Sequence, residues 1–143
     1  MGILTIASVA VLVLIAPLPA VAQSSAQKPT IQQGTAPQTD PNSGAEMFTA
    51  YCAACHGRDA KGSGPAAAAL KAPPADLTRL SANNKGTFPQ ATFDAAVLKG
   101  PTPSHGTSEM PVWGPVFRSL GGADTAALRV ANLRKYVESL QVK

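Results

Sequence analysis

Cysteine and histidine are scarce in this 143-residue chain, which contains only two of each. Structural zinc sites use four protein ligands, mostly of these two types. Because His105 lies far from the other three candidate ligands in the sequence, a zinc site is disfavoured. A phosphate-binding loop is also disfavoured, since the glycine-rich stretch 57–65 has neither a preceding strand pattern nor a Gly-Lys-Ser/Thr sequence.

Charged and aromatic residues are sparse as well. Charged side chains make up 14% of the sequence and aromatic side chains 5%, and the formal net charge is +4. The basic residues are spread along the chain, without the Lys/Arg runs or interleaved aromatics that are typical of nucleic-acid binding. We therefore predict no nucleic-acid partner, and the modest net charge by itself indicates no other partner.

The most informative stretch that is present runs from Cys52 to His56 and reads Cys-Ala-Ala-Cys-His. Two thiols with this spacing lie about one helical turn apart, within reach of the two vinyl groups on one edge of a porphyrin. The histidine that follows can place an imidazole nitrogen at the iron as an axial ligand. The motif therefore predicts one covalently attached haem c, with Cys52 and Cys55 as thioether sites and His56 as the proximal ligand.

A Cys-x-x-Cys pair also occurs as a disulfide or as a thioredoxin-like redox motif, and the spacing alone leaves these alternatives open. A thioredoxin-like motif would follow a strand in a βαβ unit. Neither residues 45–51 nor the loop after His56 has a strand pattern, so the haem interpretation is favoured.

The N-terminal part of the chain does not have the pattern of a folded core. Residues 1–22 carry no charged side chain and end in Ala-Val-Ala, which predicts a secretory signal peptide cleaved after Ala22, with an uncleaved membrane anchor as the alternative. Residues 23–42 are rich in Gln, Ser, Thr and Pro and predict a flexible linker. Residues 43–143 form the predicted domain, which is small enough that a haem would supply much of its core.

Helix signals occur throughout this domain. A capping box at Ser43 and Glu46 predicts a helix that leads into Cys52. A second helix is expected over residues 87–100, and Asp124 is expected to cap a final helix. In that final helix the predicted buried residues are Leu128, Ala131, Leu133, Tyr136, Val137 and Leu140, and the predicted exposed residues are Arg129, Arg134, Lys135 and Glu138.

The stretch 101–115 is rich in Pro and Gly and predicts an irregular loop. It carries Met110, whose thioether is the predicted sixth ligand of the iron. His105 is the rival ligand, although its setting is that of an exposed loop histidine. Trp113 is expected to pack near the haem or in the ordinary core.

These features together resemble class I cytochrome c, an all-α fold wrapped around one haem. In that family the first and last helices cross, with a glycine of one helix against an aromatic residue of the other. Gly44, Phe48, Leu133 and Tyr136 occupy the matching places. The resemblance also implies that the carbonyl of Pro65 accepts a hydrogen bond from the His56 ring. The length of the linker and of the Met110 loop is more similar to bacterial periplasmic cytochromes than to the mitochondrial type.

With His56 and Met110 both bound, the iron would have no open position, which favours a one-electron carrier cycling between Fe(III) and Fe(II) over an enzyme. A dehydrogenase or a terminal oxidase is the expected redox partner. The alternative is a haem-bearing electron-entry subunit of a dehydrogenase or oxidase complex. A peroxidase-like site would need an open sixth position, with only His105 as a distal acid–base group. Export predicts a periplasmic or other extracytoplasmic location, with membrane attachment if residues 1–22 are retained.

Overall fold

The computed structural model describes Met1, residues 36–100 and residues 109–142. The helices described below all lie within residues 34–143, which form one compact unit. The described residues form helices and no strand, which confirms the all-α prediction. None of these helices is both long and apolar enough to cross a bilayer. The predicted signal peptide and most of the predicted linker lie outside the described residues.

The first helical segment leads directly into the cysteine motif, as predicted. It consists of α1 (Gly44–Met47), a π-helical turn (Phe48–Cys52) and α2 (Ala53–His56). The Ser43 hydroxyl accepts a hydrogen bond from the Glu46 backbone N–H at 3.2 Å, so Ser43 is the N-cap as predicted. The other half of the predicted capping box differs, because the Ser43 N–H donates to the Asp40 carbonyl at 3.1 Å. The π turn was not predicted. Such turns insert an extra residue into a helix and change the direction in which the following side chains point.

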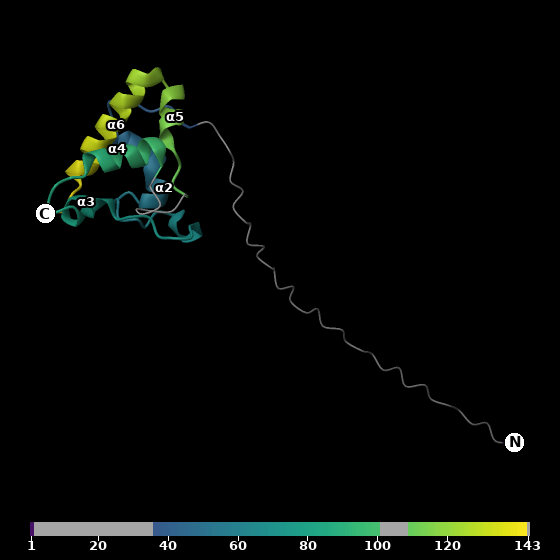
Figure 1. The fold of residues 1–143 in the computed structure, drawn as a ribbon. Coiled ribbons are helices and arrows are strands. Elements are labelled where there is room, and N and C mark those ends of the chain that lie inside the picture. The colour runs from purple at the N-terminus through teal and green to yellow at the C-terminus, as the bar shows by residue number, and fades with distance from the viewer. Residues whose placement is uncertain (2–35, 101–108, 143) are drawn as a thin grey trace. The chain divides into compact units, whose positions relative to one another are not determined.

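The middle of the unit consists of short elements and one longer helix (Figure 1). Two 3₁₀ turns, Ala67–Ala69 and Leu77–Arg79, come first, and α3 (Leu80–Asn83) follows the second. The longer helix, α4 (Gln90–Lys99), confirms the helix expected over 87–100 but starts later, with Pro89 as its N-cap. Gly100 ends it at a φ of +87°, a conformation that favours glycine.

The last two helices differ from the predicted boundaries. Helix α5 (Trp113–Ser119) includes Pro115, which the sequence assigned to an irregular loop. A proline in the first turn of a helix is tolerated because that turn has no intrahelical acceptor for its N–H. Helix α6 (Gly122–Ser139) starts before Asp124, with Gly121 as its N-cap, so the prediction that Asp124 caps it is wrong. Asp124 instead lies in the first turn, where its charge favours the helix dipole.

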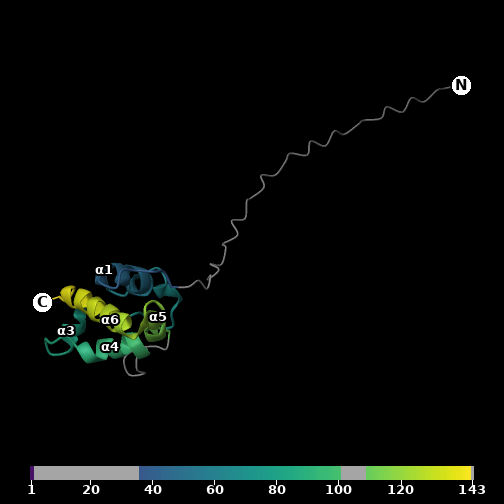
Figure 2. The same cartoon turned by 90° about the horizontal axis from the view of Figure 1, so that it is seen from above.

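Helix α6 packs against α1, α4 and α5 (Figure 2). At the crossing with α1, a Cβ on Gly44 would lie 2.8 Å from the Cβ of Tyr136 and would also overlap the carbonyl oxygen of Asn132. The rings of Phe48 and Tyr136 lie 5.4 Å apart, and Leu133 is fully buried. The crossing of the first and last helices expected from the resemblance is therefore present.

The buried face of α6 agrees with the prediction only in part: Leu133 and Val137 are buried as predicted, but two other residues are exchanged. Leu128 is 42% exposed, whereas Arg129 is only 2% exposed. The buried stripe consists of Ala126, Arg129, Val130, Leu133 and Val137. The residues at i−3, i+1 and i+4 from Arg129 are apolar and buried. Helical periodicity therefore places Arg129 on the same buried face of α6. The prediction assumed that a charged side chain lies outside, which fails when the group finds buried hydrogen-bond acceptors.

Residues 36–42, which composition assigned to the flexible linker, contact the helices instead. Arg129 donates hydrogen bonds to the Oγ1 and carbonyl oxygen of Thr39 at 2.7 and 2.9 Å. The Tyr51 hydroxyl lies 2.8 Å from the same Oγ1 and donates to the Pro37 carbonyl at 2.6 Å. Asn132 donates to the Pro41 carbonyl at 3.0 Å. The polar composition of residues 36–42 predicted a flexible linker. The prediction is wrong because the residues that hydrogen-bond with this segment, Tyr51, Arg129 and Asn132, are distant from it in the sequence.

Candidate haem-binding site

The two motif cysteines lie on one helical turn, as their spacing predicted. Cys52 is the last residue of the π turn and Cys55 lies within α2. Both are free thiols and both side chains are half-buried. Cys52 packs against the hydrophobic core, which leaves its sulfur in apolar surroundings next to the helix that holds Cys55.

The surroundings of Cys52 do not suit thiol–disulfide chemistry. Desolvation by burial, and secondly the charge of a Cys55 thiolate, raise the pKa of Cys52 from 9.0 to about 12. A redox-active thiol needs a lowered pKa, because the thiolate is the nucleophile. The raised pKa of Cys52 therefore disfavours a thioredoxin-like role for the pair. Within residues 36–100 and 109–142, no three Cys, His, Asp or Glu side chains lie together as metal ligands would.

The His56 ring is fixed by the backbone. Its Nδ1 lies 3.0 Å from the carbonyl oxygen of Ala75. A carbonyl can only accept, so Nδ1 carries the proton and Nε2 has a free lone pair. Burial lowers the pKa of His56 below 6.5, and the hydrogen bond to Ala75 opposes this effect only in part. The ring is therefore neutral at pH 7 and has one nitrogen available as a metal ligand.

The acceptor for His56 is not Pro65, so the role that the resemblance implied for Pro65 is corrected. Hydrogen bonds from Gly64 N to Cys55 O at 3.0 Å and from Ala66 N to Ala54 O at 2.8 Å hold the backbone around Pro65 against α2. The segment after Pro74 supplies the acceptor instead. Sequence could not reveal this, because every residue has a carbonyl and only the path of the chain decides which one meets the ring.

The residues that follow Ala75 are held by hydrogen bonds. The Leu77 N–H donates to the Ala60 carbonyl at 2.8 Å, which anchors the segment to the loop after the motif. The Asp76 carboxylate accepts hydrogen bonds from the backbone N–H and the hydroxyl of Thr78, at 2.9 and 2.6 Å. This cap lowers the pKa of Asp76. The Ala75 carbonyl is thus a fixed acceptor for the histidine ring.

The glycine-rich loop after His56 folds back over the motif helix. Gly62 N–H donates to the His56 carbonyl at 2.7 Å. A Cβ on Gly64 would lie 2.6 Å from the Ala53 carbonyl oxygen, so only glycine allows this approach. The loop therefore packs closely against α2, and the face of α2 that it covers is here called the outer side.

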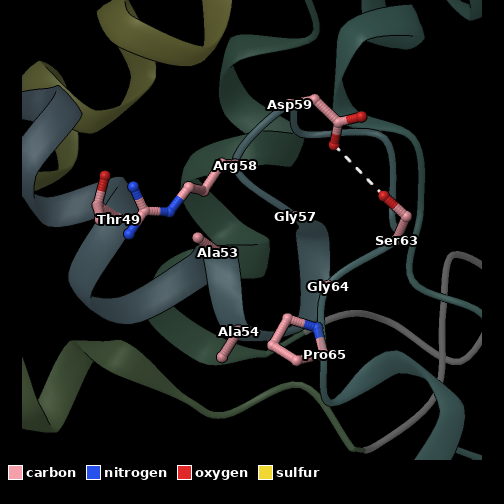
Figure 3. Close-up of a pocket in the computed structure, with 9 residues that line it drawn as sticks. All are labelled: Thr49, Ala53, Ala54, Gly57, Arg58, Asp59, Ser63, Gly64 and Pro65. Atoms are coloured by element: carbon pink, nitrogen blue, oxygen red, sulfur yellow. Dashed lines mark hydrogen bonds between the residues drawn. The ribbon is translucent and has the colours of Figure 1, made fainter.

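An open hollow of about 550 Å³ lies on that outer side (Figure 3). It is lined by Thr49, Ala53, Ala54, Gly57, Arg58, Asp59, Ser63, Gly64 and Pro65. Neither motif cysteine nor His56 lines this hollow. The hollow is therefore not formed by the groups predicted to hold the haem.

The other predicted site residues lie before and at the start of α5. Met110 and Trp113 are half-buried and pack against the hydrophobic core. The Trp113 ring lies 5.0 Å from that of Tyr51, the residue next to Cys52, and 5.9 Å from that of Phe117. His105 lies outside the described residues.

The chemistry of these residues fits a covalently bound haem. Cys52 and Cys55 would supply the thiols, His56 a nitrogen ligand in a fixed orientation, and Met110 a soft thioether ligand. The sequence did not reveal two hydrogen-bonding residues. They are Ala75, whose carbonyl accepts from the His56 ring, and Thr39, whose hydroxyl and carbonyl accept from Arg129.

A comparison with protein families agrees with this site. The family model described as cytochrome c oxidase, cbb3-type, subunit III, matches residues 39–128, which is more than half of the chain and begins before residue 43. No curated protein and no solved structure matches the chain. The chain therefore belongs to the family of cytochrome c oxidase, cbb3-type, subunit III, and is a c-type cytochrome domain with covalently bound haem c and a role in electron transfer.

Proposed function

We propose that this chain is a class I, monohaem cytochrome that carries single electrons between larger redox proteins. Cys52 and Cys55 would form the two thioether bonds, and His56 and Met110 would be the axial ligands. The observation that carries the proposal is the fixed His56 ring, whose Nδ1 lies 3.0 Å from the Ala75 carbonyl within one turn of both thiols. Two cysteines in the whole chain provide for one haem of this type.

A bound haem supplies an iron that changes oxidation state by one electron. The chain's own residues would do the rest. The Ala75 carbonyl keeps the His56 ring oriented, and the apolar core packs against Cys52. A methionine thioether favours Fe(II) more than a second imidazole does, which suits a carrier of high reduction potential.

The first test is a reduced pyridine haemochrome spectrum of the purified protein after acid–acetone extraction. A c-type spectrum with the haem retained supports thioether attachment. Loss of all haem on extraction would return the motif to a thiol-redox interpretation.

The sixth ligand is tested on the oxidised protein. We expect a weak long-wavelength iron–sulfur charge-transfer band that disappears in Met110→Ala. The matched control is Met47→Leu, because Met47 is fully buried in the core and this change conserves its volume. The band should survive in the control, and its absence from the wild type would favour His105 as the ligand.

Ligand binding separates a carrier from a peroxidase-like enzyme. A carrier with both axial positions filled should not bind carbon monoxide rapidly in its native ferrous form. Rapid binding would mean an open sixth position and would support the enzyme hypothesis.

A second candidate is favoured by the family description, which names an oxidase subunit. In this version the chain is the electron-entry subunit of a larger oxidoreductase complex. Co-purification with a larger catalytic protein at high salt would support a stable subunit, because salt screens the weak charge contacts of a transient shuttle.

The proposed location is periplasmic or otherwise extracytoplasmic, with cleavage after Ala22. The intact mass of the mature protein tests it. A membrane-bound species that retains residues 1–22 would support the anchor instead.

A further inference from the structure

Glu109, the residue before Met110, makes a contact that none of the roles above requires. Its two carboxylate oxygens accept hydrogen bonds from the backbone N–H of Lys71, at 3.2 and 3.0 Å. The two residues are 38 positions apart. The contact therefore joins the segment that carries the predicted sixth ligand to a distant part of the chain.

The Lys71 side of this contact leads back to the cysteine motif. Lys71 follows the 3₁₀ turn Ala67–Ala69. The residue before that turn, Ala66, donates its N–H to the carbonyl of Ala54, which lies between the two motif cysteines. Backbone hydrogen bonds and one carboxylate thus connect Met110 with the helix that bears Cys55 and His56.

We infer that Glu109 is a positioning residue that keeps the Met110 sulfur in the sixth position by clamping its segment to the Lys71 N–H. This rests on the proposed function, since it takes Met110 as the axial ligand. A hydrogen bond to an ionised acceptor is about twice as strong as a neutral one, so a single carboxylate can hold this segment. The clamp decides how readily Met110 leaves and an external ligand enters.

The experiment uses the oxidised, haem-loaded full chain and measures two quantities. One is the intensity of the iron–sulfur charge-transfer band, and the other is the rate at which added imidazole displaces the methionine. Glu109→Ala should bind imidazole about tenfold faster or more, the size expected for losing a hydrogen bond to a charged group. Glu109→Gln retains one acceptor oxygen and should give an intermediate rate.

Two variants of Lys71 separate its backbone from its side chain. Lys71→Pro removes the N–H, and the extended backbone of Leu70, at φ −87° and ψ 149°, is compatible with a following proline. This variant should bind imidazole as fast as Glu109→Ala, and the double variant should be no faster than either. Lys71→Ala keeps the N–H and should behave as wild type.

Glu138→Ala is the charge control, because Glu138 is an exposed carboxylate of α6. Equal imidazole rates in Glu109→Ala and Glu138→Ala would overturn the inference. The inference would also be overturned if Lys71→Ala bound imidazole as fast as Glu109→Ala. That result would mean that Glu109 is held by the Lys71 ammonium group and not by the Lys71 backbone N–H. If the wild type lacks the band, the proposed function itself fails; if the band is present and Glu109 has no effect, only the clamp fails.

Discussion

Gly44 lies where α1 and α6 approach most closely, and its missing side chain sets their separation. A Cβ there would lie 2.8 Å from the Cβ of Tyr136 and would overlap the Asn132 carbonyl. Gly44→Ala should therefore reduce the free energy of unfolding by about 1 to 3 kcal/mol, the usual cost of overpacking. Denaturant unfolding of the haem-loaded protein measures this.

The control for that substitution is Ala45→Leu, because Ala45 is an exposed neighbour in the same helix. Ala45→Leu adds more atoms than Gly44→Ala does. At the exposed position 45 these atoms contact no neighbouring helix. An equal loss of stability in both variants would show that the close approach at Gly44 does not limit packing.

The Thr39 hydroxyl is hydrogen-bonded to two other side chains, those of Arg129 and Tyr51. It accepts from Arg129 at 2.7 Å and lies 2.8 Å from the Tyr51 hydroxyl, which itself donates to Pro37. Thr39→Val keeps the shape but removes both interactions, so we expect a loss of about 1 to 3 kcal/mol. Hydrogen exchange of residues 36–42 should become faster.

Thr49→Val is the matched control, since the exposed Thr49 hydroxyl only donates to the Ala45 carbonyl of its own helical segment. Unfolding measurements should separate the two threonines clearly. If Thr39→Val costs no more than this control, the buried network contributes nothing measurable.

At the scale of elements, the 3₁₀ turn Leu77–Arg79 is capped by Asp76. Hydrogen bonds from Thr78 lower the pKa of Asp76 below 3.8 in the folded protein. A carboxyl whose pKa is lower when folded contributes stability that is fully present above its unfolded value. That contribution is lost as the pH falls through the lower folded value.

We therefore expect Asp76→Ala to cost about 1 kcal/mol at pH 7, as for loss of an N-cap. The difference from wild type should shrink as the pH falls below 3.8, and high salt should reduce the part that comes from nearby charges. Urea unfolding at several pH values tests this. A difference that grows toward low pH would contradict the assigned cap.

At the scale of the whole molecule, the hydrophobic core of residues 36–142 includes side chains that are left half-buried, among them Cys52, Leu98, Met110 and Trp113. A domain of about a hundred residues has little stability to spare. The double variant Cys52→Ala, Cys55→Ala should lose its haem on purification and much of its helical signal with it. Circular dichroism and haem absorbance measure both.

Ala54→Ser is the control, since this exposed motif residue changes while both thiols stay. It should retain haem and helicity. Cooperative unfolding of the haem-free double variant with native helix content would mean that the core is sufficient without a cofactor.

Local chemistry in the sequence was enough to predict several features. The Ser43 cap, the helix leading into Cys52 and the end of α4 at Gly100 each depend on neighbouring residues. The crossing at Gly44 was predicted from a resemblance, since no local rule pairs it with Tyr136.

Tertiary structure decided the rest, because the deciding partners are far apart in the chain. Arg129 is buried because the Thr39 hydroxyl and carbonyl meet it across 90 positions. The His56 acceptor is Ala75, not Pro65, because the loop between them folds back on α2. A motif of side chains specifies which groups bind the haem, whereas the path of the backbone specifies which carbonyls and N–H groups hold them in place.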